Sequence, residues 1–169
     1  MPNVLKTYVR VVDRFNRGVG RVTMYLIFVM MGILLWSSMS KAFFLPSLWT
    51  LEMAQFVMAA YFLLGGAYSL QMDSHVRMDL AYGRWSPKTK AMIDVITIFM
   101  LFIYLFFLLY GGISSTTYAI KYNETSYSSW SPYMAPIKIT MVIGIFLTFL
   151  QATSIFIKDL AVALGRPLA

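Results

Sequence analysis

The sequence contains no cysteine and only one histidine, His75. The absence of cysteine excludes a disulfide framework, a thiol nucleophile and a zinc–thiolate site. Haem held between two histidines is also excluded, because two are needed. The sequence has no G-x-S-x-G turn for a hydrolytic triad and no glycine-rich phosphate loop for ATP hydrolysis. We therefore expect neither catalytic residues nor a cofactor, and a protein that is not an enzyme.

Charged residues are also scarce. They make up 12% of the chain, whereas hydrophobic residues make up 59%, and the charged share is about half of that in soluble domains. A soluble fold of 169 residues cannot bury that much apolar surface, so the composition indicates one integral membrane domain, 1–169. The net charge of +7 is then a signal of membrane topology and not of nucleic-acid binding.

Four long runs contain no charged residue: Val22–Ser40, Met53–Met72, Val95–Ile120 and Ile139–Ile157. A helix needs about 20 residues to cross the hydrocarbon core, and all four runs are of that order or longer. Backbone groups in lipid must bond within their own segment, so each run should be helical. We predict an all-α integral membrane fold with four transmembrane helices. The predicted spans are about 22–40, 53–72, 92–120 and 137–157.

Positive charges are distributed unevenly around these runs. Eleven of the 14 Lys and Arg residues lie in the N-terminal segment, in the connection between the second and third runs, and in the C-terminal tail. The opposite side has only Lys41, Lys121 and Lys138. The positive-inside rule therefore places both termini in the cytoplasm.

The N-terminal segment 1–21 combines positive charge with helical spacing. At 100° per residue, five basic side chains fall within an arc of roughly 80°. These residues, the basic stripe, are Lys6, Arg10, Arg14, Arg17 and Arg21. The opposing side contains Leu5, Tyr8, Val12, Phe15 and Val19. We predict an amphipathic helix along the cytoplasmic membrane surface with its basic stripe toward lipid headgroups. The alternative is an ordinary basic flank with accidental spacing.

Small and helix-capping residues indicate where these helices bend and begin. Gly18 and Gly20 offer a bend into the first span. Thr50 precedes the second span, and Ser86 with Pro87 precedes the third. The last helix has two possible starts, one at Ser131–Pro132 and one at Pro136.

The four runs contain no ionisable residue, although transporters that conduct ions or acids usually have such residues within their spans. Glu52 and Lys41 lie at the outer boundary, and they are expected either to pair or to be solvated separately. We infer that the chain does not conduct a solute alone. The rival hypothesis is a small oligomeric carrier that uses Glu52.

Two further patterns were considered as sites. Asp73, His75 and Asp79 do not share a helix face, and no second His or Cys completes a metal site. Rows of small residues let helices approach closely in lipid, either within this chain or against a partner. Such rows are Gly65 with Ser69, Gly112 with Thr116, and Gly144 with Thr148 and Ala152.

The stretch WTLEMAQFVMAAYFLLGGAYSLQMDSHVRMDL, residues 49–80, resembles the signature of one membrane protein family. This is the DctQ family, the small membrane subunit of tripartite ATP-independent periplasmic (TRAP) transporters. A Trp and a Glu open the span, a Gly/Ala stretch follows, and an H-V-R-M-D box comes after it. The matching residues are Trp49, Glu52, Gly65, Gly66, Ala67, His75, Val76, Arg77 and Asp79. The WSP motif before the last span is similar to the family as well.

The resemblance implies a non-catalytic scaffold subunit in the bacterial inner membrane. Such proteins brace a large membrane subunit, which has the substrate and sodium sites, and a periplasmic binding protein delivers an organic acid. The further partners expected are membrane lipids, and no nucleic acid. The resemblance and the small-residue rows together give candidate structural or partner-interface residues: Trp49, Glu52, Gly65, Gly66, His75, Arg77, Asp79 and Gly144. The aromatic outer loop is expected at the headgroup level or against the binding protein.

Overall fold

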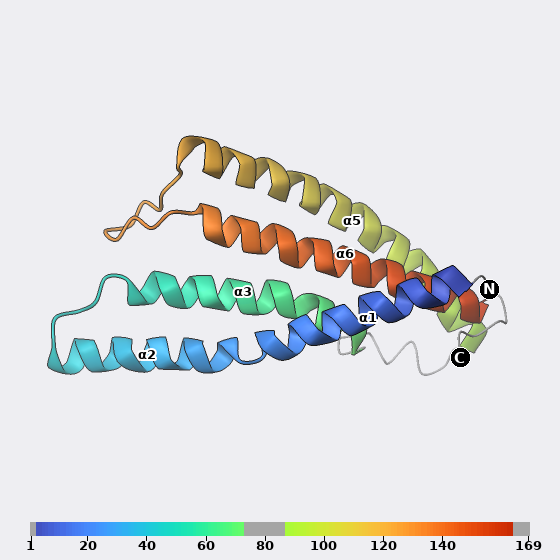
Figure 1. Cartoon of the computed structure of the whole chain (residues 1–169), viewed down its shortest axis with the longest axis horizontal. Helices are drawn as coiled ribbons and strands as arrows, with labels where there is room; N and C mark the ends of the chain where they lie inside the picture. The colour runs from blue at the N-terminus through green and yellow to red at the C-terminus, as the bar shows by residue number, and fades with distance from the viewer. Residues whose placement is uncertain (1–2, 73–86, 164–169) are drawn as a thin grey trace.

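The structure, a computed structural model, describes residues 3–72 and 87–163, and its regular elements there are helices (Figure 1). These are α1 (Asn3–Thr23), α2 (Leu26–Phe43), α3 (Thr50–Gln71), α5 (Pro87–Tyr122) and α6 (Ala135–Ala163). Four helical segments are long and apolar enough to cross a membrane: the α1–α2 run, α3, α5 and α6. The predicted all-helical membrane class is therefore confirmed.

Several helices begin where the sequence indicates a start. α3 begins at Thr50 with Glu52 in its first turn, and α5 begins at Pro87. α6 begins at Ala135, beside Pro136, so the later of its two possible starts is used. Ser131 lies before the helix with a φ of 45°. The helices extend beyond the uncharged runs and include flanking charged residues, such as Lys121 in α5 and Lys158 in α6.

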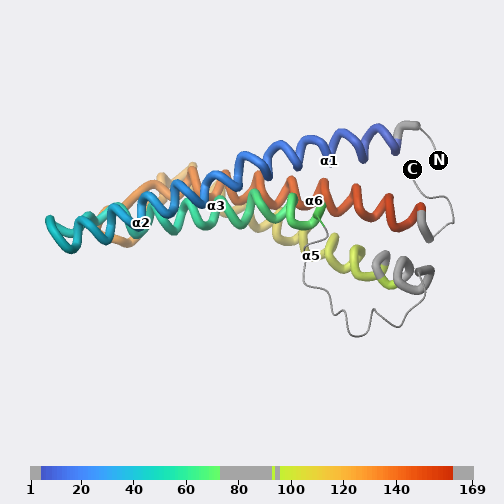
Figure 2. Tube along the Cα trace, turned by 90° about the horizontal axis from the view of Figure 1, so that it is seen from below, coloured from blue at the N-terminus to red at the C-terminus, as the bar shows by residue number. Residues whose placement is uncertain are grey.

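The helices are arranged around a central pair, α3 and α6. α2 packs on the far side of α3, and α5 packs on the far side of α6 (Figure 1). Near the connections at 44–49 and 123–134 the four form one layer, a single helix thick (Figures 1 and 2). At the opposite end, α1 and α5 lie on opposite sides of α6 (Figure 2).

The central contact depends on small residues. A Cβ added at Gly144 of α6 would lie 2.7 Å from the backbone oxygen of Leu63 of α3, closer than real Cβ atoms come. A Cβ at Gly66 would lie 3.6 Å from Thr148 Oγ1, and Ala152 is fully buried. The row of small residues on α6 therefore packs within the chain, one of the two uses that the sequence left open.

The connection between α1 and α2 differs from the expected one. α1 continues through Gly18 and Gly20 and ends at Thr23, so the bend expected at these glycines is wrong. The break instead lies at Met24–Tyr25. Gly20 has a different role, because a Cβ there would collide with the ring of Tyr68 in α3. This close approach, rather than backbone freedom, requires glycine at that position.

The packed face of α1 also differs from the expected apolar side. The buried residues of α1 are Val9, Val12, Asn16, Gly20 and Thr23. Phe15, which was assigned to the apolar side, is 59% exposed. α1 lies against α3 and α6 and runs on from α2 (Figure 1). The basic stripe is exposed along the outside of α1; its location at a membrane surface stays a prediction.

The sequence left open whether Lys41 and Glu52 form a pair, and the structure contains no such pair. Lys41 and Glu52 are both described, and no salt bridge joins them. Lys138 Nζ instead lies 2.6 Å from Glu124 Oε2, joining the start of α6 to the loop before it. An isolated β-bridge between Thr125 and Tyr133 closes the same loop.

Replacing Gly144 by Val should lower the midpoint of thermal unfolding in detergent. The added methyl groups cannot fit against the Leu63 backbone, and overpacking of this kind costs about 1–3 kcal/mol. The matched control is Gly111→Val on α5, where a Cβ meets nothing within 4 Å. Equal midpoints for the two variants would show that the close α3–α6 contact does not stabilise the fold.

Candidate partner interface

The candidate interface residues do not gather at one place. Trp49 and Glu52 lie at the start of α3, whereas Gly65 and Gly66 lie in its second half. Gly144 lies on α6 against α3. The remaining candidates, His75, Arg77 and Asp79, lie outside the described residues. The described candidates therefore belong to two regions of α3 and its neighbour, and they do not form a single pocket.

The glycines among the candidates have neighbours within the chain. A Cβ at Gly65 would lie 3.8 Å from Thr23 Cγ2 of α1, and Gly66 faces Thr148 of α6. Gly144 sets how closely α3 and α6 approach, whereas a Cβ at Gly65 or Gly66 would make only ordinary van der Waals contact. Whether any of them also contacts a partner stays a prediction.

Glu52 has an unusual environment among the candidates. Its Oε2 atom is shielded from solvent and has no hydrogen-bond partner. The helix start beside it is fixed by Thr50, whose hydroxyl donates to Ser37 Oγ of α2 over 3.1 Å. Trp49 next to it is 38% exposed. This corner of the α2–α3 hairpin combines a rigid backbone, an aromatic ring and an incompletely bonded carboxylate.

Large apolar side chains are exposed along α2 and α5. On α2 they are Ile27, Phe28, Val29, Met31, Leu34, Leu35, Trp36 and Met39. On α5 they include Ile96, Phe99, Met100, Ile103, Tyr104, Phe106, Phe107 and Tyr110. An apolar surface this extensive is suited to lipid or to another membrane protein and not to water.

A second constellation joins α1 to α6, and we name Asp13, Asn16, Gln151, Ser154 and Lys158 the polar cluster. The Asp13 carboxylate accepts hydrogen bonds from Gln151 Nε2 at 3.0 Å and from Ser154 Oγ at 2.9 Å. Lys158 Nζ lies 2.5 Å from its second oxygen. Gln151 and Ser154 are fully buried. The carboxylate is thus bonded on both oxygens, which offsets the cost of placing it against a helix.

Further hydrogen bonds extend this contact in both directions along α1. Asn16 Nδ2 donates to Gln151 Oε1 over 2.7 Å, so the Gln151 amide is bonded at both ends. The Tyr8 hydroxyl lies 2.6 Å from Thr153 Oγ1. Gln71, the last residue of α3, donates to the backbone oxygen of Asp13 over 3.1 Å. At Asp13, α1 is therefore hydrogen-bonded to both α3 and α6.

Sequence reasoning missed the polar cluster. Lys158 entered only among the basic residues of the C-terminal tail that indicate topology, and neither Asp13 nor Gln151 was assigned a role. One signal was available: Asp13 is the only acid in 1–21, and Asn16 follows it by three residues, one turn along the same helix face. Its partners lie on α6, more than 130 residues away, and no local pattern indicates them.

Asp13→Ala should release α1 from α6. The loss of hydrogen bonds to a charged group, partly exposed here, costs about 2 kcal/mol. Because the chain has no cysteine, disulfide formation between Tyr8→Cys and Thr153→Cys measures the contact without background. We expect slower crosslinking in the Asp13→Ala background. Glu124→Ala, which breaks the ion pair at the other end, is the control and should leave the rate unchanged; an equal loss in both would contradict a local role.

A search of curated proteins found no match. The family model described as tripartite ATP-independent periplasmic transporters, DctQ component, matches residues 30–162, which is well over half of the chain. The match covers most of α2, all of α3 and α5 and nearly all of α6, whereas α1 precedes it. With four helical segments suited to crossing a membrane, the chain is a multi-pass membrane protein that belongs to the DctQ component family of TRAP transporters.

Proposed function

We propose that this chain is a non-catalytic scaffold subunit of a sodium-driven, binding-protein-dependent transporter for organic acids. The DctQ family works in TRAP transporters together with a large membrane subunit and a binding protein. In this proposal the large subunit moves the solute, and the present chain braces the part of it that stays still. The helix arrangement is the observation that supports this role most directly.

Near the connections at 44–49 and 123–134, α2, α3, α5 and α6 form a layer one helix thick with two broad faces (Figures 1 and 2). Its central helices, α3 and α6, are fixed by backbone-level contact at Gly144. Its outer helices, α2 and α5, expose large apolar side chains. Such a layer is suited to lie flat against a larger membrane protein, where rigid packing resists the movement of a neighbouring element.

The polar cluster supports a rigid brace as well. It ties α1 to the last helix, so the first and last helices of the chain are fixed to each other. Outside α1, charged side chains of the described helices lie near the helix ends, as Lys41, Lys121 and Lys158 do. A chain that conducted an acid itself would be expected to place ionisable groups near the middle of its spans.

The proposal includes an orientation. Both termini face the cytoplasm, and the basic stripe of α1 meets lipid headgroups at that surface. The connection at 123–134 then faces the periplasm. Tyr127 and Trp130 on that connection are exposed, and we place them at the headgroup level, where aromatic side chains are enriched.

Single cysteines test this orientation. With no native cysteine to mask, Lys6→Cys should react with a membrane-impermeant maleimide only after the membrane is opened. Thr125→Cys should react in intact cells from the periplasmic side. The reverse labelling pattern would invert the assigned topology.

Transport assays test the scaffold role. Purified alone and reconstituted into liposomes, the chain should accumulate no organic acid under a sodium gradient. Co-reconstitution with the large subunit and the binding protein should give uptake, and omitting the present chain should abolish it. Copurification of the large subunit with the tagged chain is the parallel measurement of assembly.

A self-contained carrier is the second candidate, and the unbonded, shielded Oε2 atom of Glu52 is the observation that favours it. Under that alternative, Glu52→Gln abolishes proton-coupled transport by the isolated chain. Under the scaffold proposal, the isolated chain is inactive with or without the substitution, and Glu52→Gln weakens assembly instead. Glu124→Gln, in the loop on the same side, is the control for loss of one carboxylate.

A further inference from the structure

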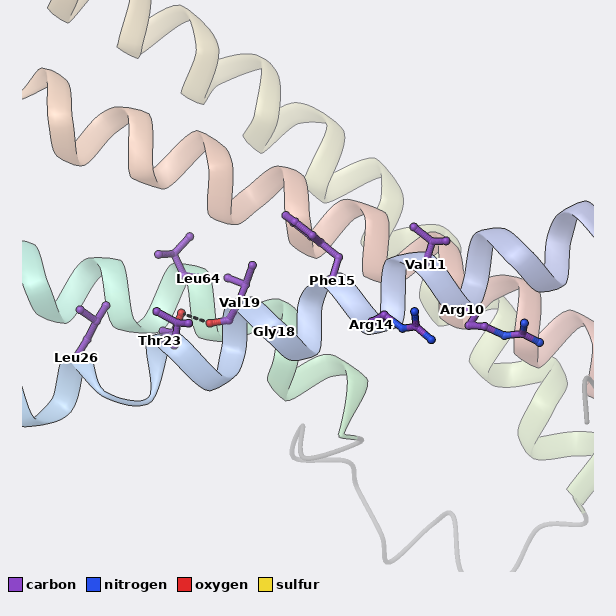
Figure 3. A pocket seen from close by; sticks show the side chains of 10 residues that line it. Arg10, Val11, Arg14, Phe15, Gly18, Val19, Thr23, Leu26 and Leu64 are labelled. Atoms are coloured by element: carbon purple, nitrogen blue, oxygen red, sulfur yellow. Dashed lines mark hydrogen bonds between the residues drawn. The ribbon is translucent and has the colours of Figure 1, made fainter.

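An apolar groove of about 1000 Å³ runs along α1 where that helix meets α2 and α3. It is lined by Val11, Phe15, Val19 and Val22 of α1. Leu64 of α3 lies at the end of the groove near Thr23, away from Arg10 (Figure 3). The Thr23 hydroxyl in its wall donates to Val19 O over 2.9 Å, so that group is already bonded (Figure 3). The remaining lining is hydrocarbon except for two guanidinium groups at one end.

Those two groups belong to Arg10 and Arg14, which Figure 3 shows along the same edge of α1. The same arginines also line a neighbouring cavity of about 430 Å³, together with Lys6, Arg17 and Lys158. Lys158 is engaged by Asp13 in that cavity. Among the described residues, Lys6, Arg10, Arg14 and Arg17 form no salt bridge, so this cavity has a surplus of positive charge.

The charged and apolar ends lie at different depths. Gln71, the last residue of α3, bonds to the Asp13 backbone and fixes Arg14 near the end of that helix. Leu64 lies seven residues earlier on α3, roughly 10 Å further along the helix axis. In a bilayer the groove therefore leads from the headgroup region into the upper hydrocarbon region, with the cations at the headgroup end.

We propose that this groove binds one anionic phospholipid, with its phosphate between Arg10 and Arg14 and its acyl chains along Phe15, Val19 and Leu64. The two adjoining cavities match the two parts of such a molecule: the basic cavity suits an anionic headgroup, and the apolar groove suits a hydrocarbon chain. The proposal goes beyond the scaffold role and requires only that α1 to α3 lie in a bilayer.

A helix of a partner protein is the competing occupant. It would fill the apolar groove equally well, but it would leave the positive cavity without a counter-charge. A phospholipid supplies apolar chains and an anion in one molecule, at the spacing that the groove provides. The charge at one end therefore favours the lipid.

Native mass spectrometry of the purified full-length chain in detergent, titrated with phosphatidylglycerol or phosphatidylcholine, tests the proposal. We expect one tightly retained phosphatidylglycerol and weaker retention of phosphatidylcholine. Arg10→Gln with Arg14→Gln should reduce phosphatidylglycerol binding roughly tenfold or more, because each cation near an anionic group contributes on the order of a few-fold in affinity. Lys41→Gln with Lys121→Gln removes the same charge elsewhere and should have no effect.

A second variant fills the groove without touching a charge. Gly18 lines the groove, and a Cβ there meets nothing within 4 Å, so Gly18→Leu places a side chain in the space for the acyl chains. It should abolish retention of the tight lipid. Gly32→Leu is the matched control, since Gly32 on α2 is equally open and lies outside the groove.

Three outcomes would overturn the proposal. The first is unchanged phosphatidylglycerol retention in both groove variants. The second is equal retention of the two lipids by the unmodified chain. The third is a Gly18→Leu chain that retains its lipid but no longer copurifies the large subunit, because the groove would then receive a partner helix. The first two results say nothing about assembly or transport, and the third would itself be evidence that the chain binds the large subunit, so the two proposals fail separately.

Discussion

The close approach of α3 and α6 at Gly144 determines the arrangement of the other helices. The backbone of Leu63 lies so close to Gly144 that no larger side chain fits between the two helices at this point. Each central helix then has one side left for an outer helix, α2 on α3 and α5 on α6. In lipid, where apolar side chains gain little by leaving the solvent, such van der Waals contact is the main attraction between helices.

The polar cluster restricts how α1 can slide or rotate against α6. Apolar contacts tolerate sliding and rotation, whereas the Asp13 carboxylate accepts bonds from three particular side chains on one face of α6. Its position therefore fixes the register of α1 against α6. Gly20 against Tyr68 fixes the same helix against α3. Two contacts of different chemistry thus hold the N-terminal helix, which lies before the region that the family shares.

The sequence was sufficient to predict the helices but not their contacts. Uncharged runs and caps such as Thr50 and Pro87 predict helices because these signals are local. The positions of Gly20 and Asp13 depend on side chains from α3 and α6, so the backbone freedom of glycine suggested a bend at Gly20, and no signal gave Asp13 a role. Phe15 illustrates the same limit: helical spacing assigned it to the side opposite the basic stripe, but it is exposed and lines the groove.

The family resemblance also had a local basis. Trp49, Glu52 and the glycine pair were recognised as a motif, and the structure adds what the glycines touch. In the structure, the Oε2 atom of Glu52 has no hydrogen-bond partner. A motif identifies residues without saying which neighbours they require, and that information comes only from the assembled helices.

The span of the polar cluster has a consequence for biosynthesis. Chains are made from the N-terminus onward, and Asp13 emerges long before Gln151, Ser154 and Lys158, its partners 138 to 145 positions later. Until the final helix is inserted, water solvates the carboxylate, and α1 can dock only against α3. Docking of the first helix against α6 thus requires that translation has reached the last helix, and a chain truncated before it would leave Asp13 without these partners.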